Sequence, residues 1–323
     1  MPKVSVLVAV HNAEKWLTQC LDSLMSQTLT DIQVICVDDA STDGSLRILN
    51  DFARRDKRLE VVPMAENVGM AKARNIALAK AKGDYICMLD SDDWYGNDAL
   101  EKAVDVFESN PATDVVLFQF MYVFPDHEQL FPSKPFTVID GRTACQLSLD
   151  WQIHGIYMVR RAIHMQYPYD DTCRLFSDEN TTRLHYAVSR EIRYCEGTYY
   201  YRQHEASMSH RPSVRQFDKL KAKESLIKSL QELSIDVQQL TNMLWIDVVD
   251  LYMFHHVHGY QLTKAEREYG MQEIRRVWST IDRSVLNKKT TAKFGYRPCC
   301  SWHLFRLQEW LYFTIRGFLG KNH

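Results

Sequence analysis

Apolar positions in the N-terminal third of the chain follow two alternating patterns. Continuous apolar runs, typical of strands buried on both faces of a parallel sheet, cover residues 4–10, 32–37, 59–64 and 85–89. Between these runs apolar residues recur every three or four positions, which predicts helices over residues 13–27, 46–52 and 70–81. This alternation predicts an α/β fold with a doubly wound, mostly parallel central sheet flanked by helices.

The remainder of the chain divides into a mixed part and a helical part. Strand patterns continue at residues 114–124, 155–159, 191–195 and 197–201, with helical patterns at 100–108 and 181–188 and a turn-rich excursion at 125–135. After about residue 215 strand patterns largely vanish, and helical spacing covers residues 220–233, 240–252 and 261–281. We therefore predict a domain over residues 1–212, followed by a helical C-terminal region over residues 213–323.

Composition excludes several classes of protein. The chain has 323 residues, of which 46% are hydrophobic and 25% charged, as in ordinary globular proteins. A formal net charge of -2 gives no argument for nucleic-acid binding. There is no signal-peptide pattern, and no apolar run reaches the ~18–20 residues of a membrane span. The 8 cysteines are scattered without a C-x-x-C pair, so we expect a reducing, cytoplasmic location.

An acidic cluster follows the strand predicted at residues 85–89. Asp90, Asp92 and Asp93 crowd at its carboxyl end, where ligands bind in open α/β sheets. Such close carboxylates raise one another's pKa unless a cation or a hydrogen-bond donor offsets their charge. A hard divalent metal prefers carboxylate oxygens. The alternative is an acidic cap for the helix expected to begin near Asn97.

Two more polar clusters follow neighbouring predicted strands. His11 and Asn12 come after the first strand, and Asp38 and Asp39 after the second. Because carboxyl ends of parallel strands meet at one edge, convergence favours a ligand site over coincident caps. Asp39 could accept a hydrogen bond from a base, and His11 could stack on one. Arg74 could reach a phosphate or base, or lie on a solvated helix face. No G-x-G-x-x-G follows the first strand, which argues against the usual dinucleotide-binding fingerprint.

These motifs occur in an order that resembles family 2 glycosyltransferases. The resemblance covers the first hundred residues or so, and resumes more weakly around residues 176–210. It is carried by residues 4–17, by Val-Asp-Asp-Ala-Ser-Thr-Asp-Gly-Ser at 37–45, Glu-Asn-Val-Gly at 66–69, Ala-Arg-Asn at 73–75 and Leu-Asp-Ser-Asp-Asp at 89–93. It implies the GT-A fold, inversion of the anomeric centre and a nucleotide-activated donor, most often a UDP-sugar.

The resemblance also implies roles for the strand-end residues. Ala9, His11 and Asp39 are expected to line the nucleoside site. The triplet at residues 90–92 would be the DXD motif, with Asp90 at the ribose and Asp92 at a Mn²⁺ or Mg²⁺ ion that bridges the donor diphosphate. Such an ion would act as a Lewis acid for the leaving nucleoside diphosphate.

Two later segments complete the resemblance. The family's catalytic acid pair corresponds to Asp178 and Glu179, which stand here in reversed order. Glu179 is the expected base and Asp178 its neighbour or substitute, although a helix cap would show the same residues. Residues 201–209 resemble a late Tyr-Arg-x-His-x-x-Ser segment. It makes Arg202 a candidate substrate contact and His204 a candidate metal ligand or phosphate contact.

The expected protein is therefore a cytoplasmic hexosyltransferase-type glycosyltransferase of surface-polysaccharide or glycolipid synthesis. Residues 1–100 would bind the nucleotide-sugar, and residues 101–212 a saccharide or lipid-linked saccharide acceptor. One alternative is a homologue that binds a nucleotide-sugar but has impaired catalysis. Another is a nucleotidyltransferase, which would be expected to show a glycine-rich triphosphate loop near the first strand; none is visible.

The C-terminal tail, residues 293–323, mixes aromatic and basic residues. Three interpretations remain open: a helix in a membrane interface, packing on the catalytic domain, and a homodimer contact. His255, His256 and His258 suggest a metal site, but adjacent helical residues point apart, which favours a structural role.

Overall fold

The computed structural model describes residues 1–173, 176–203 and 213–319, without the side chains of Ser177 and Asp178. The chain forms two compact units. The α/β unit comprises residues 1–171 and 177–205, and the helical unit comprises residues 172–176 and 206–323. The boundary predicted near residue 212 falls outside the described residues and stays a prediction.

Within the described residues, ten strands form one sheet. The four N-terminal strands are parallel in the order β3 (Leu59–Pro63), β2 (Ile32–Asp38), β1 (Val4–Val10) and β4 (Tyr85–Met88). The path then continues through β9 (Tyr157–Arg160), β6 (Thr113–Val123), β10 (Glu191–Arg202) and β5 (Trp94–Tyr95). Two short strands, β7 (Glu128–Leu130) and β8 (Val138–Ile139), pair with β6 and β10.

The direction of β9 changes the character of the sheet. It lies antiparallel to both β4 and β6, while β10 runs parallel to β6. The parallel arrangement predicted for the N-terminal half is therefore confirmed, and the second half is mixed. The two late strands predicted at residues 191–195 and 197–201 are one strand, β10, with a register shift between Tyr194 and Thr198. Gly197 lies in this shift, where a Cβ would come 2.6 Å from the Ala99 backbone oxygen.

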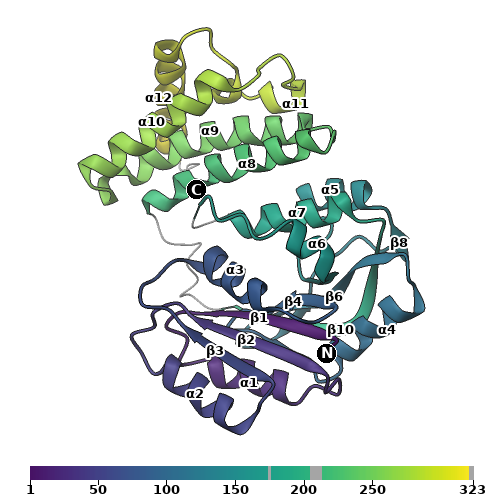
Figure 1. Ribbon diagram of the computed structural model, residues 1–323. Coiled ribbons are helices and arrows are strands. Elements are labelled where there is room, and N and C mark those ends of the chain that lie inside the picture. Colours follow the sequence, from purple (N-terminus) through teal and green to yellow (C-terminus); the bar gives the residue numbers. More distant parts are fainter. Residues whose placement is uncertain (174–175, 204–212, 320–323) are drawn as a thin grey trace. The chain divides into compact units, whose positions relative to one another are not determined.

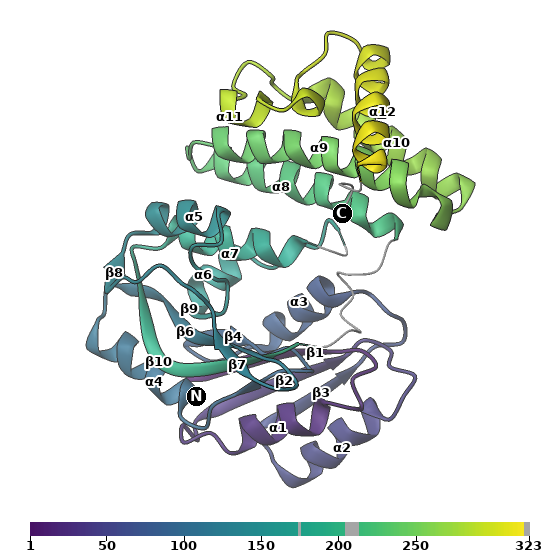
Figure 2. The ribbon, with the colours of Figure 1, turned by 180° about the vertical axis from the view of Figure 1, so that it is seen from behind.

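Helices cover both faces of the sheet. Figures 1 and 2 show α1 (Leu17–Met25) and α2 (Ser45–Arg55) on one face and α3 (Met70–Lys80) on the other. The remaining helices of the unit are α4 (Ala99–Ser109), α5 (Gly141–Leu149), α6 (Arg161–Gln166) and α7 (Ser177–Val188). Residues of β1, β2 and β4 are almost wholly buried, as expected for strands enclosed by helices. The predicted α/β fold is confirmed.

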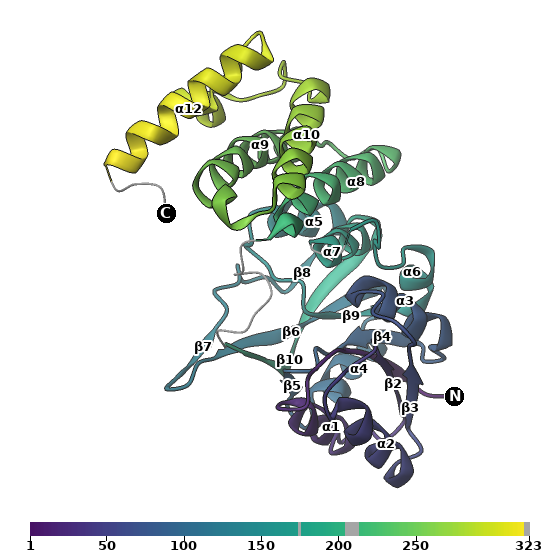
Figure 3. The ribbon, with the colours of Figure 1, turned by 90° about the vertical axis from the view of Figure 1, so that its left-hand side faces the viewer.

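The C-terminal region is helical, as predicted. It contains α8 (Asp218–Glu232), α9 (Gln238–His258), α10 (Lys264–Thr280), the short α11 (Lys288–Thr291) and α12 (Trp302–Phe318). Its core is aromatic, with Phe217, Trp245, Phe305 and Phe313 all buried. Figure 3 shows α12 alongside the helices of this unit, and its inner residues Phe305 and Trp302 contact Trp245 and Trp278.

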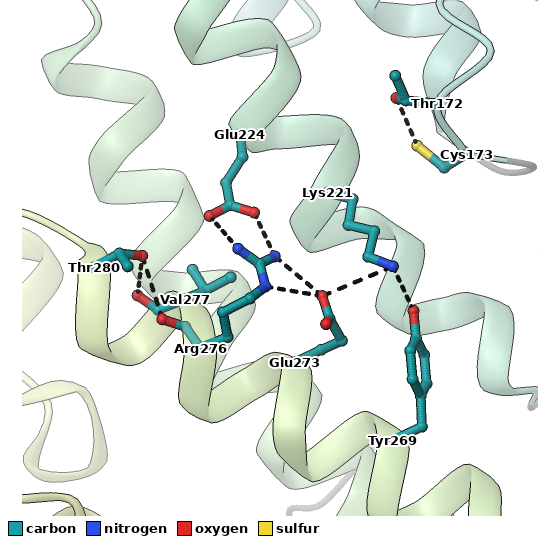
Figure 4. Close-up of polar contacts among 9 residues, drawn as sticks. All are labelled: Thr172, Cys173, Lys221, Glu224, Tyr269, Glu273, Arg276, Val277 and Thr280. Atoms are coloured by element: carbon teal, nitrogen blue, oxygen red, sulfur yellow. Dashed lines mark hydrogen bonds and ion pairs between the residues drawn. The ribbon is translucent and has the colours of Figure 1, made fainter.

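Charged side chains join α8 to α10 within the helical unit. Arg276 donates to both carboxylate oxygens of Glu224, at 3.0 and 2.6 Å, and also to Glu273 (Figure 4). Lys221 donates to the Tyr269 hydroxyl at 2.8 Å. The bidentate pair fixes the two helices in register more specifically than a single-point contact would.

The described part of the chain contains no helix long and apolar enough to cross a membrane. All 8 cysteines lie within it, and all are free thiols.

Candidate functional site

Three strand ends meet where the sequence predicts a ligand site. β1 lies between β2 and β4, so the residues that follow these strands share one edge of the sheet. Nδ1 of His11 lies 2.8 Å from the backbone oxygen of Asp39, and since a carbonyl only accepts, Nδ1 carries the proton. Asn12 and Ala40 adopt left-handed backbone conformations, with φ of 53° and 55°. Such unfavourable conformations persist where surrounding contacts impose them, and they often mark functional sites.

Asp39 organises the segment before α3. Its buried carboxylate accepts hydrogen bonds from the backbone N–H groups of Val68, at 2.6 Å, and Gly69, at 2.9 Å. Gly69 has a φ of 91°, a conformation that suits only glycine. Ala9, the third residue predicted at a nucleoside site, lies in β1 opposite Val37 of β2. The structure therefore gives Asp39 a positioning role beside the predicted contact with a ligand.

Arg74 is buried and paired with Asp90. Only 1% of the Arg74 side chain is exposed, and its Nη2 lies 2.5 Å from Oδ1 of Asp90. The interpretation of Arg74 as a solvated helix residue is therefore wrong, because its guanidinium contacts Asp90 of the turn after β4 (residues 90–93, here called the acidic turn). Its charge offsets part of the repulsion within that turn. The guanidinium also lies 5.5 Å from the ring centroid of Tyr169.

Asp93, to which the sequence assigns no role, fastens the acidic turn to β10. Its carboxylate accepts hydrogen bonds from the Tyr199 hydroxyl, at 2.7 Å, and from the Arg202 backbone N–H, at 2.8 Å. The same hydroxyl accepts a bond from the Asp90 N–H at 3.3 Å. Burial, together with the charges of Asp90 and Asp92, raises the pKa of Asp93 to about 9. The partners come from distant parts of the chain, so no local motif reveals the contact.

The guanidinium of Arg202 lies between two tryptophan rings. Its central carbon is 4.2 Å from the ring centroid of Trp16 and 4.6 Å from that of Trp94. Nε donates to the backbone oxygen of Asp92 at 3.0 Å, and Nη2 donates to Gln19 at 2.5 Å. Arg202 thus holds the backbone of the predicted metal ligand, a positioning contact that the sequence did not indicate.

A pocket of about 290 Å³ connects Asp90 of the acidic turn with Glu179 of the predicted catalytic pair. Its polar residues include Asp90, Arg74 and Glu179. Oε2 of Glu179 accepts a hydrogen bond from Nη1 of Arg183 at 2.8 Å. Glu179 and Asp90, which lie far apart in sequence, therefore face one cavity. The Asp178 side chain and the whole of His204 lie outside the described residues, so the roles predicted for them stay predictions.

Several aromatic side chains line this pocket. They include Phe120, Tyr122, Trp151, Tyr157, Tyr169 and Tyr201. Two buried histidines, His154 and His164, also line it. Burial lowers the pKa of His154 to about 3, and burial with the charges of His185 and Arg74 lowers the pKa of His164. Among the described residues neither ring nitrogen of His164 has a hydrogen-bond partner.

Within the described ranges, no group of three or more His, Cys, Asp or Glu side chains is arranged to hold a metal ion. In the helical unit, Nε2 of His255 lies 3.2 Å from the backbone oxygen of Arg267, a structural contact.

Comparison with known proteins decides the family. The model for "Glycosyl transferase family 2" matches residues 5–167. The chain belongs to family 2 of the glycosyltransferases. The resemblance found in the sequence is thereby confirmed.

Similar proteins include two bacterial relatives. An uncharacterized glycosyltransferase of Haemophilus influenzae is 42% identical over 128 residues, which are 40% of this chain and 50% of the relative. The uncharacterized glycosyltransferase EpsJ of Bacillus subtilis is 29% identical over 224 residues, or 66% of this chain and 64% of the relative. This chain therefore spans between half and two thirds of the length of these two relatives.

Solved structures share the fold. Residues 1–349 of S. aureus TarS in complex with UDP-GlcNAc superpose with a TM-score of 0.73 at 20% identity, covering 99% of this chain and 92% of that TarS fragment. The complex of TarS with UDP gives a TM-score of 0.69 at 18% identity, with 98% and 92% covered. This likeness confirms the GT-A fold with a helical C-terminal region.

Proposed function

We propose that this protein is an inverting glycosyltransferase that moves a sugar from a nucleoside diphosphate donor to an acceptor hydroxyl. The observation that carries the proposal is the single pocket shared by Asp90, Arg74 and Glu179. Donor binding and proton removal must occur on opposite sides of one anomeric carbon, and this pocket offers a group for each. Family membership supports the same reaction class.

The donor would bind at the shared edge of β1, β2 and β4. Ala9, His11 and Asp39 would contact the nucleoside, and Asp90 the ribose. Arg74 would act through its ion pair with Asp90. UDP is the favoured nucleotide, because UDP-GlcNAc and UDP are the ligands of the TarS structures with the same fold.

A divalent ion, Mn²⁺ or Mg²⁺, fits the chemistry of the acidic turn. Asp92 offers the carboxylate oxygens that such ions prefer, His204 is the second candidate ligand, and phosphate oxygens commonly fill the remaining positions. When bound, the ion would neutralise charge that develops on the departing diphosphate. The hydrogen bonds of Arg202 with Asp93 and with the backbone oxygen of Asp92 hold this turn in place.

Glu179 is the proposed general base, with Asp178 as the alternative. Its carboxylate takes the proton of the acceptor hydroxyl while the hydroxyl oxygen forms a bond to the anomeric carbon. The bond from that carbon to the diphosphate oxygen breaks in the same step, and the configuration inverts. Arg183, 2.8 Å from Glu179, orients the carboxylate by a charge-assisted hydrogen bond.

The acceptor is proposed to be a saccharide or lipid-linked saccharide of surface polysaccharide or glycolipid synthesis. Aromatic walls suit the apolar faces of sugar rings. A poly(ribitol-phosphate) beta-glucosyltransferase of Bacillus spizizenii is 41% identical over 118 residues, which are 36% of this chain and 18% of the relative. The cytoplasmic location expected from the cysteines remains part of this proposal.

The test is metal-dependent turnover of a panel of nucleotide-sugars, measured as nucleoside diphosphate release. With Mn²⁺ present, we expect slow release of UDP from one or more UDP-sugars by hydrolysis. The release should be faster when a saccharide acceptor is added, because the sugar is then transferred to it. The Asp92→Asn variant should release no UDP. Absence of binding and turnover with every donor would contradict the proposal. Binding without turnover under any condition would identify a nucleotide-sugar-binding homologue instead. Pyrophosphate release from a nucleoside triphosphate and a sugar phosphate would indicate a nucleotidyltransferase.

A further inference from the structure

One face of α12 is apolar and exposed. Its inner face is buried in the helical unit through Trp302, Phe305, Glu309 and Phe313. The outer apolar side chains, here called the α12 stripe, are 40–88% exposed: Leu304, Leu307, Trp310, Leu311, Ile315 and Phe318. Most are three or four positions apart and so lie on one side of the helix. Large contiguous apolar patches are rare on monomeric proteins and mark interaction surfaces.

The exposed charged residues of the segment that carries the α12 stripe are of one sign. Residues 293–319 contain the basic residues Lys293, Arg297, Arg306 and Arg316. The sole acidic residue in that range is Glu309, which is 0% exposed. Burial raises the pKa of Glu309 to about 8, so this carboxyl adds little negative charge at neutral pH. Arg316 is half-buried against Tyr312, whereas Lys293, Arg297 and Arg306 are exposed, so the exposed charged residues of this segment are all basic.

We propose that α12 lies in the interface of an anionic lipid surface, with the α12 stripe among the acyl chains. Basic side chains and a tryptophan flanking an apolar helix face match the chemistry of that boundary. A second copy of the chain fits less well, because two copies paired through this face would bring Arg306 and its neighbours against each other. Anionic headgroups complement the same charges. The helix lies on the surface and does not cross it.

Co-sedimentation of the full chain with lipid vesicles tests this proposal. We expect binding to vesicles of phosphatidylcholine with phosphatidylglycerol, much weaker binding to phosphatidylcholine alone, and release by added salt. The double substitution Leu307→Gln with Trp310→Gln should lower the partition coefficient at least about tenfold, because two large apolar side chains no longer enter the membrane. Arg297→Gln with Arg306→Gln should lower it to a similar extent, on the anionic vesicles alone.

Tyr260→Ser is the matched control, since Tyr260 is a 79% exposed aromatic of the helical unit outside α12, and it should leave binding unchanged. All substituted residues are exposed, so circular dichroism should show unchanged folding. The proposal is overturned if the full chain binds neither vesicle, or if the Leu307/Trp310 variant binds as well as the unsubstituted chain. A third result would also overturn it: sedimentation without lipid shows that the unsubstituted chain is a dimer and the Leu307/Trp310 variant a monomer, and neither protein binds vesicles.

Discussion

The hydroxyl of Tyr199 lies 2.7 Å from Oδ2 of Asp93 and joins the last long strand of the sheet to the acidic turn after β4. The hydroxyl oxygen also accepts a hydrogen bond from the backbone N–H of Asp90 at 3.3 Å. One phenol thus contacts the turn on both sides of the predicted metal ligand Asp92. The orientation of that ligand should therefore depend on a residue that touches neither metal nor substrate.

Tyr199→Phe tests this dependence. The substitution keeps the edge-on packing of the ring against Tyr95 but removes both hydrogen bonds of the hydroxyl. Loss of such a positioning contact typically costs 10–100-fold in metal affinity or activity. We expect kcat/KM to fall by about that factor, and the Mn²⁺ concentration for half-maximal activity to rise. Tyr200→Phe, whose ring stacks on Trp94, is the control and should change neither. An unchanged metal requirement in Tyr199→Phe would refute the positioning role.

Glu179→Gln should separate donor binding from transfer. The amide keeps the shape of the side chain but cannot accept the acceptor proton, and general bases typically contribute about 10²–10⁴-fold. We expect kcat to fall by about that range while thermal stabilisation by the donor is retained. Asp178→Asn should have a smaller effect. If Asp178→Asn is inactive and Glu179→Gln is not, the base is Asp178.

The sequence predicts those parts of the protein that depend on neighbouring residues. Strands β1 to β4 and the polar residues at their ends follow from local patterns. Strand direction does not, because periodicity carries no pairing information, and so antiparallel β9 was not predicted. The helix α5 was missed because its apolar spacing is irregular, and its cap, Asp140 accepting from Thr143, becomes clear in the structure. The clamp of Trp16 and Trp94 around Arg202 depends on contacts between distant residues.

Trp151→Ala should weaken acceptor binding. Trp151 lines the pocket with a half-exposed ring, and its left-handed φ of 54° shows that surrounding contacts fix its position. Loss of an aromatic stacking contact costs about 1 kcal/mol in addition to the free energy of the apolar area it buries. The KM for a saccharide acceptor should therefore rise about fivefold or more. Donor KM should stay the same. Tyr260→Ala, outside the pocket, is the control. An equal rise in donor KM would place Trp151 at the donor instead.

Gly69→Ala should destabilise the α/β unit. A side chain at φ 91° is strained by about 1–3 kcal/mol, and relief of that strain would move the N–H groups that Asp39 holds. Urea unfolding should show the loss, and donor binding should weaken with it. Gly96→Ala is the control, because its Cβ would meet nothing closer than 3.6 Å. A Gly69→Ala protein as stable as Gly96→Ala would contradict the argument.

Because the carboxyl of Glu309 is buried, we expect the helical unit to lose stability as the pH rises. This carboxyl is buried in α12, accepts a bond from Gln308 at 3.1 Å, and has a pKa raised from its ordinary 4.5 to about 8. The folded state therefore holds this proton more tightly than the unfolded state. The stability that the protonated Glu309 contributes is fully present below the pKa of this carboxyl in the unfolded chain. It declines as the pH rises from 4.5 to about 8, the pKa in the folded chain.

Each unit of pKa shift is worth about 1.4 kcal/mol, so the free energy of unfolding should fall by a few kcal/mol across that window. Glu309→Gln should remove this pH dependence and be the more stable form at high pH, because it buries an uncharged group. Denaturant titrations on both sides of the window, monitored by tryptophan fluorescence, measure the difference. Glu232→Gln, at an exposed position on α8, should keep the pH dependence of the unsubstituted chain. A Glu309→Gln protein that loses stability with pH as steeply as Glu232→Gln would show that another group is responsible.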